Sequence, residues 1–164
     1  MNKPSDIVNK DISTEEEFIQ LVEHLAVGVI KHLPDASISL ANKKALELLG
    51  LTKDQLIGKT PFDPSWHVIN EQGEEMPGQS HPAAIALLTK KPVRNVIMGV
   101  YRPLTKDRVW ILTSAVPELD QFENLKQVIV TFSEVSELKR KEILLNENNR
   151  MVKGILDSSY DMII

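Results

Sequence analysis

The sequence predicts an α+β fold in which helices cover one face of a five-stranded antiparallel sheet, with an amphipathic helix before the sheet and a coiled-coil-like helix after it. The first observation behind this prediction is a set of three runs rich in β-branched and aromatic residues, at 93–102, 108–117 and 127–135. Segments carrying Pro, Asp, Asn and Lys separate the runs, which is typical of consecutive antiparallel strands. The other two observations are a series of helix signals upstream and a charged helical stretch downstream.

Composition limits the class of protein. The 164 residues suffice for one domain with extensions, and 42% hydrophobic with 26% charged residues is the balance of a soluble globular protein. No apolar run approaches the ~20 residues of a membrane span, and the first residues lack the apolar core of a signal peptide. We therefore expect a cytoplasmic protein, or the cytoplasmic part of a membrane-anchored sensor, with no direct membrane contact.

Charge and cysteine content exclude several partners and chemistries. A net charge of −4, with Lys and Arg scattered among acids, gives no basic surface for nucleic acid. The absence of cysteine excludes a disulfide framework, a thiolate zinc site, a cysteine nucleophile and a cysteinyl-flavin adduct. Binding of nucleic acid and thiol chemistry are therefore not expected.

The N-terminal part predicts one helix and two short strands. Residues 1–12 are polar without a period and are expected to form a flexible lead-in. Ser13 and Glu16 have the spacing of a capping box, which predicts a helix start. Strand candidates follow at 27–33 and 37–41, around a turn-forming Pro-Asp-Ala cluster. The helix carries an apolar stripe at i, i+3, i+4 and i+7, formed by Phe18, Leu21, Val22 and Leu25.

Three helices and one long loop are predicted between these strands and the later ones. Asn42 is placed to cap a helix that Gly50 ends, and a second capping box opens at Thr52. A third helix begins at Pro82. The polar segment 61–78 between them is long for a compact domain, and loops of this length are usually functional or mobile.

The segment 136–156 predicts a charged helix with a narrow apolar seam. Leu138, Leu145 and Val152 recur every seven residues, and the complementary heptad positions are partly polar. This pattern favours a two-stranded coiled coil, with a solitary solvated helix as the alternative. We expect a homodimer that forms through the N- and C-terminal helices.

In this order of elements the sequence resembles a PAS domain, the sensory module of bacterial and archaeal signalling proteins. The resemblance runs from about Glu15 to Lys139. Near its end, Glu134 stands where the family usually has Asp, which puts in question how the last strand is tied to the following helix. The resemblance rests on short motifs in the family's order, namely Gly28-Val-Ile, Ile38-Ser-Leu-Ala-Asn42, Leu48-Leu-Gly50, Leu56-Ile-Gly58, Asn70-Glu-Gln-Gly73, Val109-Trp110 and Glu134-Val-Ser-Glu137.

The resemblance implies a domain organisation and a function. Residues 13–135 would be the sensor domain and 136–156 a signalling helix, while 157–164 resembles the truncated start of a second PAS domain. The implied function is a sensory and dimerisation module of a multidomain protein, such as a histidine kinase or a diguanylate cyclase, that relays a change through its C-terminal helix. The alternatives are a ligand-free assembly domain and, less favoured, a small α+β enzyme using the 61–78 loop.

The resemblance also implies where a small molecule would bind, between the inner sheet face and the helices of residues 42–91. Strand alternation places Val109, Ile111 and Thr113 on one face and Trp110 on the other. The same residues could simply fill a core, so the cofactor is undefined and the site could hold none. The candidate pocket residues are Leu46, Leu49, Trp66, Ile85, Met98, Ile111, Thr113, Val130 and Phe132.

The four histidines give no metal pattern. His24 and His32 are expected to be polar surface residues. His67 and His81 lie in or beside the long loop without the i+3 or i+4 partner of a helical metal site. By resemblance His81 is a weak candidate for a haem ligand, and the favoured interpretation is that it caps the helix beginning at Pro82. No nucleotide-binding or catalytic motif occurs, so no enzymatic activity is expected.

Overall fold

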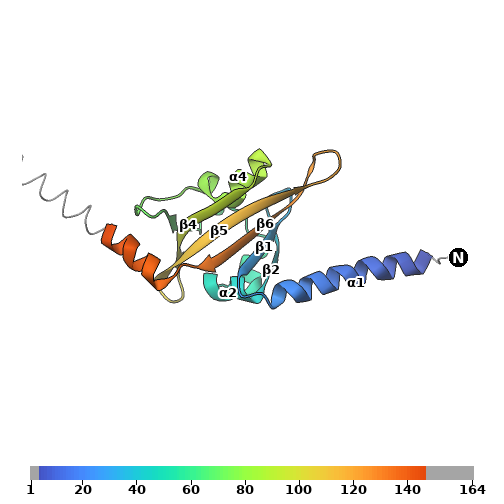
Figure 1. The fold of residues 1–164 in the computed structure, drawn as a ribbon, viewed down its shortest axis with the longest axis horizontal. Coiled ribbons are helices and arrows are strands. Elements are labelled where there is room, and N and C mark those ends of the chain that lie inside the picture. The colour runs from blue at the N-terminus through green and yellow to red at the C-terminus, as the bar shows by residue number, and fades with distance from the viewer. Residues whose placement is uncertain (1–3, 147–164) are drawn as a thin grey trace, which may run out of the picture.

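The computed structural model describes residues 4–146, with side chains from residue 14 onward. Residues 137–146, after the last strand, are helical and are called the exit helix here. Figure 1 shows α1 and the exit helix projecting from opposite ends of the sheet domain. The other elements, in chain order, are α1 (Pro4–Glu23), β1 (Gly28–His32), β2 (Ile38–Ala41), α2 (Lys43–Leu49), α3 (Lys53–Leu56), β3 (Val68–Ile69), the 3-10 helix η1 (Gly78–Ser80), α4 (Pro82–Thr89), β4 (Val93–Arg102), β5 (Asp107–Leu119) and β6 (Leu125–Glu134).

The sheet has six strands in the order β2-β1-β6-β5-β4-β3, and every neighbouring pair is antiparallel. The predicted count of five is therefore wrong, although the α+β class is confirmed. The sixth strand is β3, which lies inside the predicted 61–78 loop and pairs Val68 with Val100. A two-residue strand is too short to show a period in the sequence. The last strand in the chain, β6, lies between β1 and β5 in the middle of the sheet.

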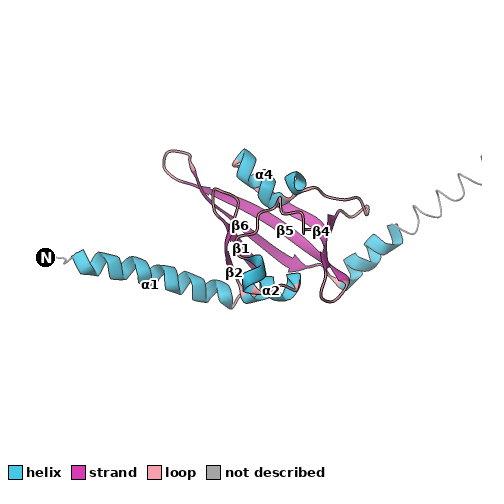
Figure 2. Cartoon of the chain, turned by 180° about the vertical axis from the view of Figure 1, so that it is seen from behind, coloured by secondary structure: helices cyan, strands magenta, loops and turns pink. Residues whose placement is uncertain are grey.

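Helices α2, α3 and α4 and their connections lie on one face of the sheet (Figure 2). The core fills the space between these helices and the sheet. The alternating burial along β5 shows which face of the sheet points to the core. Val109, Ile111 and Thr113 are buried on this inner face, as the alternation predicts. Leu112 and Val116 point to the other side, where each is 38% exposed. The inner face is thus the side on which a site can be enclosed.

Asn42 joins three elements in the core. As predicted, it caps α2, since its side-chain oxygen accepts from Ala45 N at 2.9 Å. The same oxygen also accepts from Val29 N in β1 at 2.9 Å. Its amide nitrogen donates to the carbonyls of Val22 and Val27, at 2.8 and 2.9 Å. All of its hydrogen-bonding capacity is therefore used inside the protein, which connects the end of α1 to the sheet.

The termini differ from the predictions in one respect. Helix α1 begins at Pro4, so the residues predicted as a lead-in continue the helix upstream of Ser13. Proline is tolerated there because the first turn of a helix has no internal partner for its backbone nitrogens. At the other end, the predicted continuation of the exit helix to residue 156 and the predicted second domain at 157–164 lie outside the described residues. The domain boundaries therefore stay a prediction.

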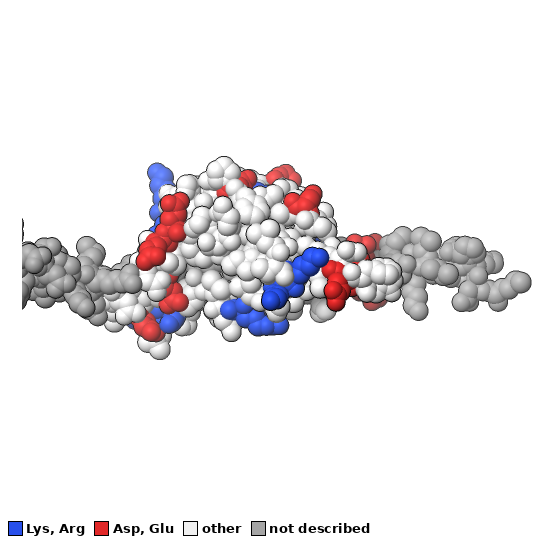
Figure 3. Space-filling model, turned by 90° about the horizontal axis from the view of Figure 1, so that it is seen from above, with Lys and Arg blue, Asp and Glu red and all other residues white. Residues whose placement is uncertain are grey.

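Two further observations concern the helices and the charged side chains of the described residues. Within residues 4–146, no helix is both long and apolar enough to cross a membrane. On the face seen in Figure 3, acidic and basic side chains are scattered and neither sign forms a continuous patch.

Candidate functional site

A cavity of about 80 Å³ lies between the inner sheet face and the helical layer. Strands β1, β4, β5 and β6 form its floor, and the 61–68 segment and the start of α4 cover it. Its wall consists of sixteen residues, namely Ile30, His32, Ile38, Leu49, Pro61, Trp66, Val68, His81, Pro82, Ala83, Met98, Val100, Ile111, Thr113, Val130 and Phe132.

Most of the predicted pocket residues surround this cavity. Two do not: Leu46 packs against the core cluster from α2, and Ile85 is half-buried on α4. Any part that these residues play in binding stays a prediction. The candidates that line the cavity are Leu49, Trp66, Met98, Ile111, Thr113, Val130 and Phe132.

The cavity wall carries no charged side chain and only three with clear hydrogen-bonding capacity besides Trp66. His32, His81 and Thr113 contribute these polar groups, and all three are buried. His32 is only 4% exposed, so its predicted surface position is wrong. The alternation along β1 explains this, because His32 shares the inner face with Ile30.

His32 has a defined tautomer. Its Nδ1 lies 2.8 Å from the carbonyl oxygen of Ala36. A carbonyl can only accept, so in the neutral ring Nδ1 carries the proton and Nε2 is left as an acceptor. Burial lowers the pKa of His32, and the hydrogen bond to Ala36 offsets this only in part.

His81 also donates from one ring nitrogen to a backbone carbonyl, but through Nε2 instead of Nδ1. It occupies the N-cap position of α4, but its side chain makes no cap hydrogen bond, so the predicted capping by this side chain is wrong. Its Nε2 instead donates to the carbonyl oxygen of Met76 at 3.0 Å, which leaves Nδ1 as an acceptor. Burial lowers the pKa of His81 as well, against the smaller opposite effect of the Met76 carbonyl.

Thr113 differs from the two histidines because its polar atom has no partner. The side chain is 3% exposed, and its hydroxyl is the one buried side-chain oxygen or nitrogen within the described residues that makes no hydrogen bond. An unpaired buried hydroxyl costs about 1–3 kcal/mol of stability. Thr113 faces Phe132 across the β5–β6 register, in the floor of the cavity.

Trp66 and Leu49 lie between the cavity and a neighbouring groove. Both residues line the cavity and also line the groove, which has a volume of about 250 Å³. The indole N–H of Trp66 donates to the carbonyl of Thr60 at 2.9 Å, and Lys59 Nζ lies 5.1 Å from the centre of its ring. The 59–66 segment therefore holds the indole in place as the outer wall.

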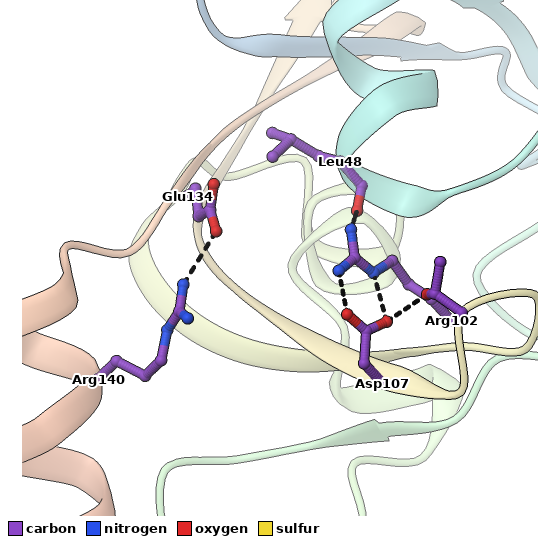
Figure 4. Close-up of polar contacts among 6 residues, drawn as sticks. Leu48, Arg102, Asp107, Glu134 and Arg140 are labelled. Atoms are coloured by element: carbon purple, nitrogen blue, oxygen red, sulfur yellow. Dashed lines mark hydrogen bonds and ion pairs between the residues drawn. The ribbon is translucent and has the colours of Figure 1, made fainter.

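The exit helix is attached where β6 ends, beside β5 (Figure 4). Arg140 of the helix donates to Glu134 of β6 at 2.9 Å. The backbone N–H of Val135 donates to the carbonyl of Trp110 at 2.8 Å, which extends the pairing with β5 beyond the strand. Lys139 Nζ lies 3.9 Å from a carboxylate oxygen of Glu71, in the loop after β3. Glu134 is thus tied directly to the exit helix.

A second polar cluster closes the β4–β5 hairpin next to this junction (Figure 4). Arg102 binds Asp107 through two nitrogens, with Nε at 2.9 Å from Oδ1. A third bond, from Arg102 Nη1 to the carbonyl of Leu48 at 3.4 Å, ties the hairpin to the end of α2. The hydrogen bonds from Arg102 and then Thr105 lower the pKa of Asp107 to about 2.

Large prosthetic groups do not fit this site. A porphyrin or a flavin ring system is several times larger than a cavity of about 80 Å³. Within residues 4–146, no group of three or more His, Cys, Asp or Glu side chains is placed to hold a metal ion.

Comparison with known proteins gives the family and the fold. The family model described as PAS fold matches residues 16–135. No curated protein matches the chain. A light-oxygen-voltage domain from a study of a flavin analogue has a TM-score of 0.57 at 18% identity, covering 82% of this chain and 96% of that domain.

Two further solved structures are PAS domains by name. The PAS domain of an HTR-like protein from Haloarcula marismortui has a TM-score of 0.56 at 10% identity, covering 80% of this chain and 99% of that one. The PAS domain of BvgS from Bordetella pertussis has a TM-score of 0.51 at 18% identity, covering 82% and 98%. At these identities the likeness is one of fold. Together with the family match over most of the chain, it shows that this protein belongs to the PAS family.

Proposed function

We propose that the chain is a cytoplasmic sensory and dimerisation module, which passes a change in its cavity through the exit helix to an output domain. The proposed output domain is a histidine kinase or a diguanylate cyclase, as the resemblance to PAS domains implies. No reaction is assigned to the described residues. The cavity is the proposed receiving site, and the junction at the end of β6 is the proposed point of transmission.

One observation carries this proposal, namely that β6 contributes residues both to the cavity and to the junction with the exit helix. Val130 and Phe132 line the cavity. Two residues further along the same strand, Glu134 pairs with Arg140 of the exit helix. A change in the packing around Phe132 therefore has a short covalent route to the helix, and packed elements tend to switch between discrete arrangements.

The exposed apolar residues of the two terminal helices support the dimer. Leu138 and Leu145 are 79% and 61% exposed, although the heptad pattern marks them as apolar seam positions. Phe18 and Leu21 of α1 are also exposed. Val152, the third seam residue, lies outside the described residues. Apolar residues repeated along a helix without internal contacts are the pattern that a partner helix would cover.

The dimer is tested by placing charges in this seam. We expect Leu138→Asp with Leu145→Asp to weaken self-association at least tenfold, because each would put a carboxylate between two packed helices. Sedimentation equilibrium of the 164-residue chain measures the constant. Leu104→Asp is the matched control, since Leu104 is equally apolar and exposed but lies in the β4–β5 turn. An unchanged constant in the double variant contradicts the coiled-coil part of the proposal.

A further inference from the structure

The wall of the cavity limits the charge of what it can hold. None of the sixteen residues around it is Asp, Glu, Lys or Arg. A charged ligand would lose its hydration there without gaining a countercharge, and that loss is too large for a few contacts to recover. The occupant must therefore be neutral, with a mainly apolar body that matches the aliphatic and aromatic wall.

The hydrogen-bonding groups limit the head group. After the bonds to Ala36 and Met76, His32 and His81 each retain one ring nitrogen that can only accept. The hydroxyl of Thr113 can donate and accept and has no partner among the described residues, but almost none of its surface is accessible, so a ligand hydroxyl reaches it only once the Thr113 side chain rotates. A hydroxyl on the ligand suits these groups, because it can donate its one proton to an imidazole nitrogen and accept the proton of the Thr113 hydroxyl.

The size of the cavity limits the body of the ligand. At about 80 Å³ it has roughly half the volume of the engineered apolar cavity, about 150 Å³, that binds benzene. A chain or branch of a few carbon atoms occupies such a space.

Building on the proposed sensory function, we propose that the cavity binds a small neutral alcohol of a few carbon atoms, whose hydroxyl is anchored by Thr113. The unpaired hydroxyl of Thr113 then has a purpose, since binding supplies the hydrogen bond that the folded chain lacks. The signal is the filling of the space beside Phe132, the neighbour of Thr113 in β6. Trp66 and Leu49 lie between this cavity and the neighbouring groove.

The test uses propan-1-ol as the probe and NMR of the 164-residue chain. The two tryptophans are built-in reporters, since Trp66 lines the cavity and Trp110 lies on the opposite face of the sheet. We expect the indole N–H signal of Trp66 to shift along a saturable curve while that of Trp110 stays in place. Equal, unsaturable shifts of both signals would be a solvent effect and would overturn the proposal.

Thr113→Val tests the anchor, because valine keeps the shape and removes the hydroxyl. We expect this change to weaken propan-1-ol binding about fivefold, the effect of one ordinary hydrogen bond. Binding of 1-chloropropane, which has no hydroxyl, should not weaken. The control Thr131→Val makes the same change in the neighbouring strand on the outer face and should leave both affinities unchanged. Equal affinity of wild type and Thr113→Val for propan-1-ol overturns the anchor.

Two further measurements separate this inference from the function on which it rests. The melting temperature of Thr113→Val should be no lower than that of wild type, so lost binding cannot be lost folding. Propan-1-ol should also shift the backbone signals of residues 137–146. If the probe binds but those signals and the self-association constant stay unchanged, the ligand class is supported and the relay is overturned. If no saturable binding occurs in a chain that still dimerises, the ligand class is overturned and the filled-core assembly domain is favoured.

Discussion

The cavity and the exit-helix junction lie on the same strands but are held by different forces. Around the cavity the side chains are buried, uncharged and packed, with Phe132 only 2% exposed. At the junction, Arg140 and Lys139 reach partially exposed carboxylates of Glu134 and Glu71. Exposed pairs of this kind contribute about 0–1 kcal/mol each, whereas a fully buried large side chain contributes several.

This difference shows which part of the molecule can move at low cost. Buried packing resists gradual deformation, so a change inside the cavity has to displace neighbouring side chains as a unit. The ion pairs of the junction can exchange for water with little penalty. Val135, just before the exit helix, and Ile143 within it are also buried, at 7% and 2% exposed. The attachment therefore combines soft ion pairs with a small packed contact beside the stiff receiving site of the proposed relay.

The largest effect on stability should come from a substitution in the packed floor of the cavity. Phe132→Ala removes a buried ring from the cavity floor, and we expect a loss of about 3–5 kcal/mol in the free energy of unfolding. Urea unfolding measures it. Phe122→Ala is the matched control, because Phe122 is 73% exposed at the tip of the β5–β6 hairpin and should change stability by less than about 0.5 kcal/mol. Similar losses in the two variants would contradict a packed receiving site.

A smaller effect should come from protonating the cavity. The pKa values of His32 and His81 are lowered by burial from 6.5, so below that pH the unfolded chain binds protons that the folded chain does not. The contribution of the two neutral histidines to the free energy of unfolding is therefore fully present above about pH 6.5. It is lost as the pH drops towards the pKa values of the folded state. The slope is at most about 1.4 kcal/mol per pH unit for each histidine.

Urea unfolding from about pH 8 to about pH 5, the range in which histidine titrates, measures this dependence. His32→Asn with His81→Gln should flatten it, because each amide can still donate to the Ala36 or Met76 carbonyl but takes up no proton. His24→Gln, at an exposed position after α1, is the control. A slope that persists in the double variant would show that the cavity histidines do not cause it.

The smallest effect should come from the junction. We expect Glu134→Gln and Arg140→Gln each to cost less than about 1 kcal/mol, with a coupling of about 0.2–1 kcal/mol that decreases at high salt. A double-mutant cycle of urea unfolding at low and high salt measures the coupling. A coupling of several kcal/mol that does not change with salt concentration would mean that the junction is as stiff as the cavity.

Local patterns in the sequence predicted the elements but not all of their connections. The cap at Asn42 was readable from its position before an apolar period. Its bonds to the carbonyls of Val22 and Val27 were not, because they join residues that only tertiary packing brings together. The two residues of β3 gave no period, and the start of α1 at Pro4 lies in a stretch with no apolar stripe.

Seven candidate pocket residues line the cavity where the resemblance to PAS domains implied it, and strand alternation placed Ile111 and Thr113 on the face that forms it. His32 was misplaced, although the same alternation puts it on the face of Ile30. Its burial conflicts with the usual preference of histidine for partial exposure, and here the local register decides. The unpaired hydroxyl of Thr113 could not be predicted, since finding it requires knowing every neighbour.

The central position of β6 has a mechanical consequence. The strand is hydrogen-bonded along both edges, with Phe132 opposite Gly28 in β1 and Thr113 in β5. Sliding by one residue would turn Phe132 out of the cavity and break the register on both sides, so a ligand cannot push β6 along its own axis. What remains free is the twist of the sheet. Under the proposed relay, a change in this twist would reach the exit helix through residues 135–136, which join β6 to the helix.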